Sequence, residues 1–328
     1  MLDPLLLAAS SHYGFSIENY ELLHETSRTL VVSLETTKGS YVLKSIYVTE
    51  KRLQFILEVE QFLRQQGTAI PMVYPTLSGE SYLEWEEDLF VLQEKIQGSS
   101  SSPSTLDAIA SKASLLGTMH NTSLGFHSHF GPDFAEEYDW EKHYIRKIRD
   151  IIEWKDRFSK SRNAKKKLIL EEVDNYLKAG TRALKLIQID AQFHQWKQLP
   201  PYKHYISHGD FHSENILYAE DQQLYIIDWE FVRYNYPSKD IGRLLNSLLK
   251  HSGSWDNNSF QNLIYHYTKY NPLNDWQLQL LYLDLSFPHN FNRFLQNRMY
   301  KEMSIEEIEL FLRREHEKTS YLIKEYPN

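Results

Sequence analysis

The sequence predicts an α+β protein of two lobes, in which a β-rich N-terminal lobe precedes a larger helical lobe. The length of 328 residues exceeds what one small hydrophobic core fills. β-branched and aromatic runs gather in the first hundred residues, and most of the later chain shows helical periodicity. One strand-like island, residues 206–230, interrupts the helical part. We therefore predict lobes at residues 1–96 and 97–328.

The composition is that of an ordinary globular protein, with 41% hydrophobic and 24% charged residues, which excludes a disordered chain. A net charge of -8 argues against a coat of bound nucleic acid, so we expect no such partner. Cysteine is absent, which excludes disulfides, thiolate metal sites and a cysteine nucleophile. The apolar patch at Leu5–Ala9 is too short to span a bilayer and is not typical of a signal peptide. We expect synthesis in the cytoplasm.

The N-terminal lobe is predicted to contain two strand pairs and one helix. Residues 50–66 carry apolar side chains at mostly helical spacing, and Gly67 ends this predicted helix. A polar turn at residues 37–40 separates the first two strands and predicts a hairpin. The predicted strands are Thr29–Leu34, Tyr41–Ile46, Tyr82–Trp85 and Phe90–Glu94.

A change of composition marks the end of this lobe. Residues 97–104 read QGSSSSPS, which is typical of a linker. The segment is either a connector between the lobes or a surface loop within one domain. The pattern from Thr105 onward is mostly helical.

The strand-like island carries three oxygen-bearing side chains. Asp210 is followed five residues later by Asn215, and a predicted hairpin then returns an apolar strand that ends at Asp228. All three groups can therefore face one point. This set suits phosphoryl transfer, because the first aspartate can orient an attacking hydroxyl and the other two groups are hard oxygen ligands for Mg²⁺. Kinase catalytic loops have the same spacing between Asp and Asn.

Two other interpretations of this island stay open. It could be a polar turn between strands with a histidine in the core. Alternatively, His204, His208 and His212 recur every four residues, and on a helix they would share a face that could bind zinc. Gly209 and the surrounding strand pattern argue against that helix.

The sequences HGDFHSENIL and IIDWE resemble the aminoglycoside phosphotransferase and choline kinase branch of the protein-kinase-like fold. The resemblance implies a two-lobed fold with a helical insertion, and ATP and Mg²⁺ as cofactors. It implies Asp210 as the catalytic base, with Asn215 and Asp228 as the magnesium ligands. His208 is expected to support the loop by packing or hydrogen bonding.

Other segments fit the same family. Lys44 lies in a predicted strand and would bind the nucleotide phosphates. Residues 94–98 resemble the hinge between lobes, where the main chain at Glu94 and Ile96 would hold adenine. Asp240, in the segment PSKDIG, would brace the catalytic loop through hydrogen bonds.

Two features depart from the family pattern. The turn between the first strands, residues 24–29, has no glycine-rich phosphate loop. The glutamate that should pair with Lys44 is also ambiguous, because Glu58 and Glu60 lie about 200° apart around the axis of the predicted helix. We prefer Glu58 as the partner.

Acceptor recognition is expected in the helical insertion, residues 130–200. Its basic run, residues 155–167, could attract an anionic acceptor or partner, or could be a solvated face. Aromatic residues in the last third of the chain could form a cage for a quaternary ammonium group, or could pack in the core. Ser304 and Glu307 form a capping-box pattern that begins the last predicted helix.

A C-terminal signature, LSFPHNF at residues 285–291 with Asn297 and Tyr300, resembles the CotS-like spore coat proteins, including the YutH group. These are kinase-like proteins of endospore-forming Firmicutes. The resemblance implies synthesis in the mother cell, association with the spore coat and coat proteins as partners.

The sequence therefore predicts a phosphotransferase that uses ATP and Mg²⁺ and transfers the γ-phosphate to a hydroxyl of an unidentified acceptor. One alternative is a catalytically weak pseudokinase that serves as a coat scaffold. A second is a housekeeping small-molecule kinase that acts on an amino alcohol or a sugar.

Overall fold

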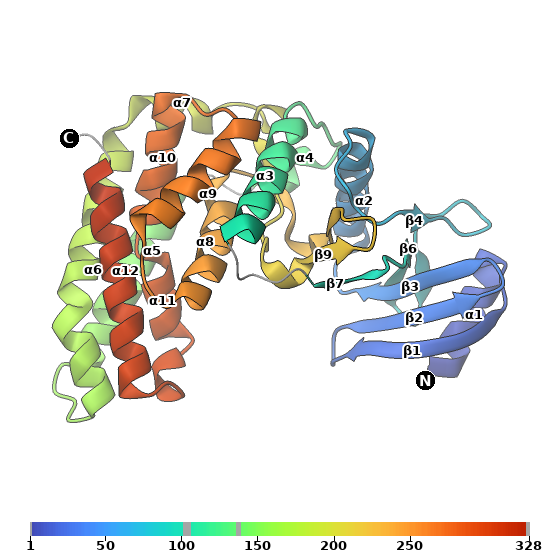
Figure 1. Ribbon diagram of the computed structural model, residues 1–328, viewed down its shortest axis with the longest axis horizontal. Helices are drawn as coiled ribbons and strands as arrows, with labels where there is room; N and C mark the ends of the chain where they lie inside the picture. The colour runs from blue at the N-terminus through green and yellow to red at the C-terminus, as the bar shows by residue number, and fades with distance from the viewer. Residues whose placement is uncertain (1, 101–105, 136–138, 326–328) are drawn as a thin grey trace. The chain divides into compact units, whose positions relative to one another are not determined.

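The structure, a computed structural model, describes residues 2–100, 106–135 and 139–325 (Figure 1). Internal contacts divide the chain into two compact units. The first comprises residues 1–101, 126–131 and 208–232, and the second comprises residues 102–125, 132–207 and 233–328. The predicted hinge lies inside the first unit, and the lobe boundary predicted at residue 96 remains a prediction. Residues 101–104 of the predicted linker lie outside the described residues.

The first unit is built on an antiparallel sheet of strand order β1-β2-β3-β6-β4, with β5 paired to β6. Pairing of Thr36 with Gly39 closes the predicted hairpin, and pairing of Trp85 with Asp88 joins the second predicted strand pair. The hairpin and the strand pair are both confirmed. The strands are β1 (Ile17–Glu25), β2 (Leu30–Thr36), β3 (Gly39–Ile46), β4 (Val73–Tyr74), β5 (Leu83–Trp85) and β6 (Asp88–Glu94).

Two helices pack against the opposite faces of this sheet. Side chains alternate along a strand, so Phe90 and Leu92 of β6 pack in one cluster with α1 (Leu2–Tyr13). Val91, which lies between them, packs in another cluster with α2 (Glu50–Gln65). The Thr49 side chain accepts the N–H of Arg52 and caps α2, as the predicted helix requires.

Helix α1 corrects the sequence analysis, which interprets Leu5–Ala9 only as a short apolar patch. The residues of α1 that become buried are Leu5, Leu6, Ala9 and Tyr13, which lie on one side of a helix. In Figure 1 this helix lies behind strands β1 to β3. The first unit therefore has a helix on each face of its sheet instead of one helix in all.

Three short strands form a second sheet in the first unit, in the order β10-β9-β7. Its strands are β7 (Gly98–Ser100), β9 (Ile216–Ala219) and β10 (Leu224–Ile226). The beginning of the predicted linker is thus a strand. A Cβ on Gly98 would lie 2.4 Å from the Tyr218 carbonyl oxygen, so the close approach of β7 to β9 requires glycine.

The second unit is mainly helical, and the predicted insertion at residues 130–200 consists of α4 to α7. Two further strands, β8 and β11, pair antiparallel. The elements are α3 (Leu106–Ser123), α4 (Gly131–Phe134), α5 (Trp140–Phe158), α6 (Ala164–Ile189), α7 (Ala191–Lys197), β8 (Tyr205–Ser207), β11 (Arg233–Asn235), α8 (Ser238–Ser252), α9 (Asn257–Tyr270), α10 (Asp275–Ser286), α11 (His289–Gln296) and α12 (Ile305–Glu325).

Helices α5, α6, α11 and α12 share one apolar core, and α6 and α12 run side by side in Figure 1. Phe291 stacks on Tyr176 with ring centroids 3.9 Å apart, and Phe294 is equally buried. These aromatic residues pack in the core and do not line a cage. At the start of α12, Ser304 and Glu307 exchange the two hydrogen bonds of a capping box, which confirms that prediction.

The basic run of residues 155–167 crosses the turn from α5 to α6. Lys155 forms an ion pair with Asp174 at 2.6 Å, and Lys166 lies over the Phe158 ring at 3.7 Å. These contacts are typical of a solvated helical face.

No helix in the described part of the chain combines the length and apolar character needed to cross a bilayer.

Candidate active site

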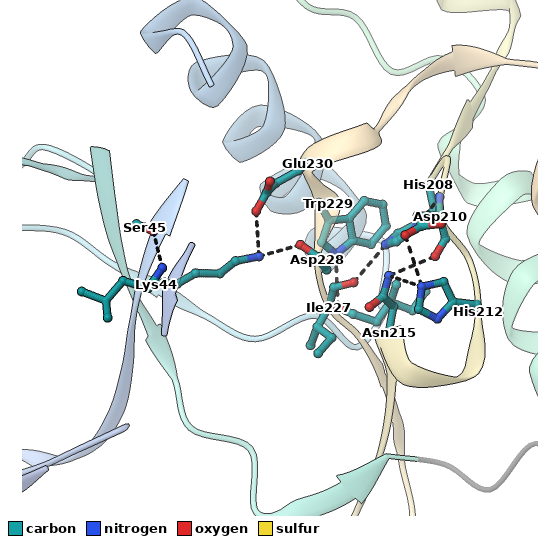
Figure 2. A network of polar contacts seen from close by, with 12 residues as sticks. Lys44, Ser45, His208, Asp210, His212, Asn215, Ile227, Asp228, Trp229 and Glu230 are labelled. Carbon is teal, nitrogen blue, oxygen red and sulfur yellow. Dashed lines mark hydrogen bonds and ion pairs between the residues drawn. The ribbon is translucent and has the colours of Figure 1, made fainter. Parts of the chain in front are cut away.

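The β9–β10 hairpin brings the ends of the predicted catalytic segment together. Ile226 pairs with Ile216, and the Ile227 N–H donates a 3.0 Å hydrogen bond to the Asn215 carbonyl. Asp228 therefore follows β10 at the point where the loop of residues 208–215 ends. Figure 2 shows Asp210, Asn215 and Asp228 within one network of polar contacts, all in the first unit.

Gly209 lets the chain turn tightly before Asp210. Its φ angle of +82° lies in the left-handed region, and a Cβ there would lie 2.4 Å from the Phe231 carbonyl oxygen. A side chain at this position would therefore meet both backbone strain and a steric clash. The glycine is a geometric requirement of the loop.

His208 is fully buried and joins the two halves of the site. Its Nδ1 accepts the Asp210 N–H at 3.3 Å, so the ring proton lies on Nε2, which is 3.0 Å from the Ile227 carbonyl oxygen. The ring also packs edge-on against Trp229, with centroids 4.8 Å apart. The structure therefore places His208 where it can support the loop.

The side chains of Asp210 and Asn215 are held from within the loop. The Asn215 amide nitrogen donates to the Asp210 carbonyl at 3.0 Å, which leaves its amide oxygen for another partner. His212 Nε2 lies 3.2 Å from Asp210 Oδ2. His212 enters the sequence analysis only as a zinc ligand, yet here it orients the predicted catalytic carboxylate.

Lys44 connects β3 to the segment after β10. Its ammonium lies 2.5 Å from Asp228 Oδ1 and 2.9 Å from Glu230 Oε1 (Figure 2). Burial lowers the pKa of Lys44, but the two carboxylates outweigh it and the net shift is upward. For Asp228, burial by itself raises the pKa, but the positive charge of Lys44 outweighs this effect and the net shift of the pKa is downward. Both groups are therefore charged at neutral pH.

Glu230 is a second partner of Lys44 that sequence reasoning missed. The sequence feature that could have identified Glu230 is its position two residues after Asp228. The backbone between these two residues, however, is not an ordinary strand. Asp228 has a left-handed φ of +68°, which few non-glycine residues adopt. A short 3₁₀ turn at Trp229–Phe231 follows, and the Arg52 guanidinium of α2 donates to the Glu230 carbonyl at 2.8 Å. These contacts hold both carboxylates against Lys44.

The structure does not bring Glu58 to Lys44. Among the described residues, no ion pair joins the two, and Glu58 Oε2 is buried without a hydrogen-bond partner. Glu60 instead lines a small pocket of about 20 Å³ together with Lys44 and Asp228. Burial raises the pKa of Glu60 to about 7, against the opposing charges of Arg64 and Lys44. Of the two glutamates weighed, Glu60 is the one beside the lysine.

The remaining predicted residues lie further from this network. Glu94 ends β6, where its N–H donates to the Met72 carbonyl at 2.8 Å, and Ile96 is half-buried between β6 and β7. Asp240, in the second unit, is fully buried and lies 3.1 Å from His120 Nε2. The adenine-binding and loop-bracing roles of these residues remain predictions.

The side chains at this site suit Mg²⁺ better than zinc. Mg²⁺ fits the donor set, because the Asn215 amide oxygen is left for a ligand and Asp228 already binds one cation, the Lys44 ammonium. The zinc alternative has no such support, since within the described ranges no three His, Asp or Glu side chains are placed to hold a metal ion. His204 Nε2 instead lies 2.9 Å from the Leu199 carbonyl oxygen.

Comparison with known proteins agrees with this geometry. The family model of the phosphotransferase enzyme family matches residues 20–273. Spore coat protein S of Bacillus subtilis (strain 168) is 24% identical over 290 residues, which are 86% of this chain and 80% of that protein.

Solved structures match over nearly the whole chain. An aminoglycoside phosphotransferase from Alicyclobacillus acidocaldarius has a TM-score of 0.80 at 17% identity and covers 97% of this chain and 94% of its own. Spectinomycin phosphotransferase, solved with ADP and spectinomycin, has a TM-score of 0.62 at 15% identity and covers 98% of each chain. These likenesses confirm the predicted fold, and with the sequence matches they confirm both predicted resemblances.

We predict that Gly209→Ala destabilises the protein more than Gly79→Ala does. Gly79 has a similar φ of +92° with nothing within 4 Å of an added Cβ, so its substitution isolates the cost of the left-handed backbone, about 1 kcal/mol. Gly209→Ala adds the clash with Phe231, and we expect a total of about 3 kcal/mol. Urea unfolding of both variants measures the difference. Equal losses would contradict the close approach.

We also predict that Glu60 makes the folded state less stable as pH rises. Its pKa increases on folding from 4.5 to about 7, so the folded protein holds this proton more tightly between those values. The free energy of unfolding should therefore fall across pH 5–7 and level off above, by on the order of 3 kcal/mol. Glu60→Gln should remove this fall, as urea unfolding at several pH values would measure. Parallel pH profiles for wild type and variant would refute the prediction.

Proposed function

This chain belongs to the phosphotransferase enzyme family, and from that premise we propose that it transfers the γ-phosphate of ATP to a hydroxyl group of an acceptor. One observation carries the proposal, the convergence of Asp210, Asn215 and Asp228 in a single polar network that includes Lys44. Structures of related enzymes with ADP or AMP support the use of an adenine nucleotide.

Asp210 would accept a hydrogen bond from the acceptor hydroxyl and orient its oxygen toward the γ-phosphate. His212 holds one oxygen of this carboxylate at 3.2 Å, and His208 fixes the main chain that carries it. Asn215 and Asp228 would hold Mg²⁺, which when bound neutralises charge on the phosphates. Each of these groups acts by position and charge, which is how most of the rate enhancement in phosphoryl transfer arises.

Lys44 would bind the nucleotide phosphates through the ammonium that now contacts Asp228 and Glu230. Those carboxylates keep the lysine charged and extended from β3 toward the loop. We propose Glu60, and not Glu58, as the glutamate on α2 that supports Lys44, because it lines the same pocket. This replaces the preference expressed from the sequence.

The turn between β1 and β2 offers little to a phosphate group. The Arg28 and Thr29 N–H groups both donate to the Thr26 hydroxyl, at 3.2 and 3.0 Å. In a glycine-rich loop such N–H groups would be aimed at the nucleotide. We therefore propose that Lys44 and the metal carry most of the phosphate binding in this protein.

The proposal predicts magnesium-dependent ATP turnover with a pooled panel of amino alcohols, sugars, aminoglycosides and spore coat extract. Asp210→Asn should reduce turnover roughly 100-fold or more, because the acceptor hydroxyl loses its hydrogen-bond acceptor. Glu60→Gln should lower turnover more than Glu58→Gln in the same assay. Turnover that is equal in wild type and Asp210→Asn would assign the signal to a contaminant and count against the proposed site.

We further propose that the protein associates with the spore coat, because Spore coat protein S resembles it over 86% of this chain. In this role the chain could act as an enzyme or as a coat scaffold that retains the fold. A housekeeping kinase for an amino alcohol or sugar is the remaining candidate. Synthesis in the mother cell is expected only if the protein associates with the spore coat.

A fluorescent fusion in an endospore-forming host would test this association. We expect the fusion to appear during sporulation, in the mother cell, and to remain in the coat fraction of purified spores. Expression in growing cells without coat enrichment would contradict the association and favour the housekeeping kinase. Localisation and coat integrity that are unchanged in Asp210→Asn would favour the scaffold over the coat enzyme.

A further inference from the structure

Asp228 is required for two cations that compete for its single negative charge. In the structure its Oδ1 lies 2.5 Å from the Lys44 ammonium (Figure 2). In the proposed function the same carboxylate also binds Mg²⁺, together with the Asn215 amide oxygen. A divalent ion and an ammonium repel each other, so a carboxylate that they share holds each of them less tightly. Metal binding should therefore displace the lysine from Asp228.

Glu230 is placed to keep the displaced lysine in the site. Its Oε1 already lies 2.9 Å from the Lys44 ammonium, so the lysine retains a counter-charge when it leaves Asp228. The Asp228 side chain is 34% exposed and the Glu230 side chain is 23% exposed. A hydrated ion therefore reaches Asp228 more readily, and Glu230 is the more sheltered partner of the lysine.

The main chain at Glu230 is fixed from α2, independently of the Asp228 side chain. The Arg52 guanidinium donates to the Glu230 carbonyl at 2.8 Å and also to the Val232 carbonyl. The Val232 N–H in turn donates to the Trp229 carbonyl at 3.0 Å, which closes the 3₁₀ turn that carries Glu230. Glu230 is therefore held in place while the Asp228 side chain changes its partner.

The other carboxylate beside Lys44 is less suited to this task. Glu60 lines the same small pocket as Lys44, but it is buried and its ion pair is with Arg64, at 3.4 Å. Glu230 makes its ion pair with the Lys44 ammonium itself. Of the two glutamates, Glu230 is thus the one that can take over the lysine without first losing another cation.

We propose that Asp228 exchanges the Lys44 ammonium for Mg²⁺ and that Glu230 holds the lysine through this exchange, as a positioning residue. The inference rests on the proposed function, because that function assigns Mg²⁺ to Asp228. With Glu230 in place, Lys44 stays where it can bind the nucleotide phosphates. Without Glu230, the lysine would depend on Asp228 alone and would oppose the metal more strongly.

Binding of Mn²⁺ without nucleotide tests the exchange, because Mn²⁺ prefers the same oxygen ligands and the resonance signal of the free ion reports its binding. Lys44→Met should bind Mn²⁺ at least ~10-fold more tightly than wild type, since Asp228 has no ammonium to release. Glu230→Gln alone should weaken binding at least ~10-fold. In the Lys44→Met background the same substitution should change affinity by less than ~2-fold. Loss of the signal change in Asp228→Asn would assign the binding to this site.

The double variant separates a positioning residue from a metal ligand. An equal effect of Glu230→Gln with and without Lys44 would make Glu230 a ligand of the metal and overturn the proposal, as would unchanged or weaker binding by Lys44→Met. Glu214→Gln is the matched control, because it removes one carboxylate from an exposed position beside Asn215 and should bind within ~2-fold of wild type. A loss as large as that of Glu230→Gln would assign the effect to net charge and refute the exchange. Lys44→Gln replaces Lys44→Met if the latter does not fold.

The turnover assay distinguishes failure of the exchange from failure of the proposed function. Turnover that depends on Asp210, without the predicted Mn²⁺ effects, would reject the exchange and leave the phosphotransfer standing. The predicted Mn²⁺ effects without turnover would uphold the exchange and count against the phosphotransfer. No Mn²⁺ binding by wild type or by either Lys44 variant would overturn the exchange.

Discussion

The ion pair between Lys44 and Asp228, with Glu230 as second partner, is the interaction on which the candidate site depends. It joins residues 184 positions apart, one on β3 and the other after β10. Lys44 and Asp228 are only partly buried, but removing one partner would still leave the other charge without its nearest compensation. The arrangement therefore holds the sheet and the predicted catalytic loop in one register. In the proposed function the same charges would bind a nucleotide and its metal, so stability and chemistry would depend on one cluster.

The loop around this cluster is held by backbone constraints as much as by its functional groups. Gly209 and Asp228 both have left-handed φ angles, and only the first is a glycine. His208 and Arg52 hold the main chain on either side through carbonyl hydrogen bonds. A strained backbone at an aspartate, held by hydrogen bonds from neighbouring side chains, is typical of functional sites.

The helical unit distributes its aromatic and cationic side chains in a way that the composition does not reveal. Aromatic residues that could have formed a ligand cage, such as Phe291 and Phe294, are fully buried between helices. Cations that are scattered along the sequence, such as Arg146 and Arg293, gather instead around one cavity. Conversely, the contiguous basic run at residues 155–167 spans the turn from α5 to α6, where Lys155 pairs with Asp174. A run of basic residues along the chain therefore does not predict which cations lie close together in the folded unit.

The features predicted from the sequence are those that depend on short-range pattern. A hairpin, a second strand pair and the helix at residues 50–66 follow from local periodicity and turn chemistry. The Asp210–Asn215 spacing is read directly from the chain. The position of Glu60, and not Glu58, in the pocket with Lys44 has no local signal, because it depends on how α2 is rotated against the sheet. The partners His212 and Glu230, and the cations around the cavity, likewise depend on chain packing. Contacts between distant residues have no local signal, since side-chain packing across the whole unit sets them.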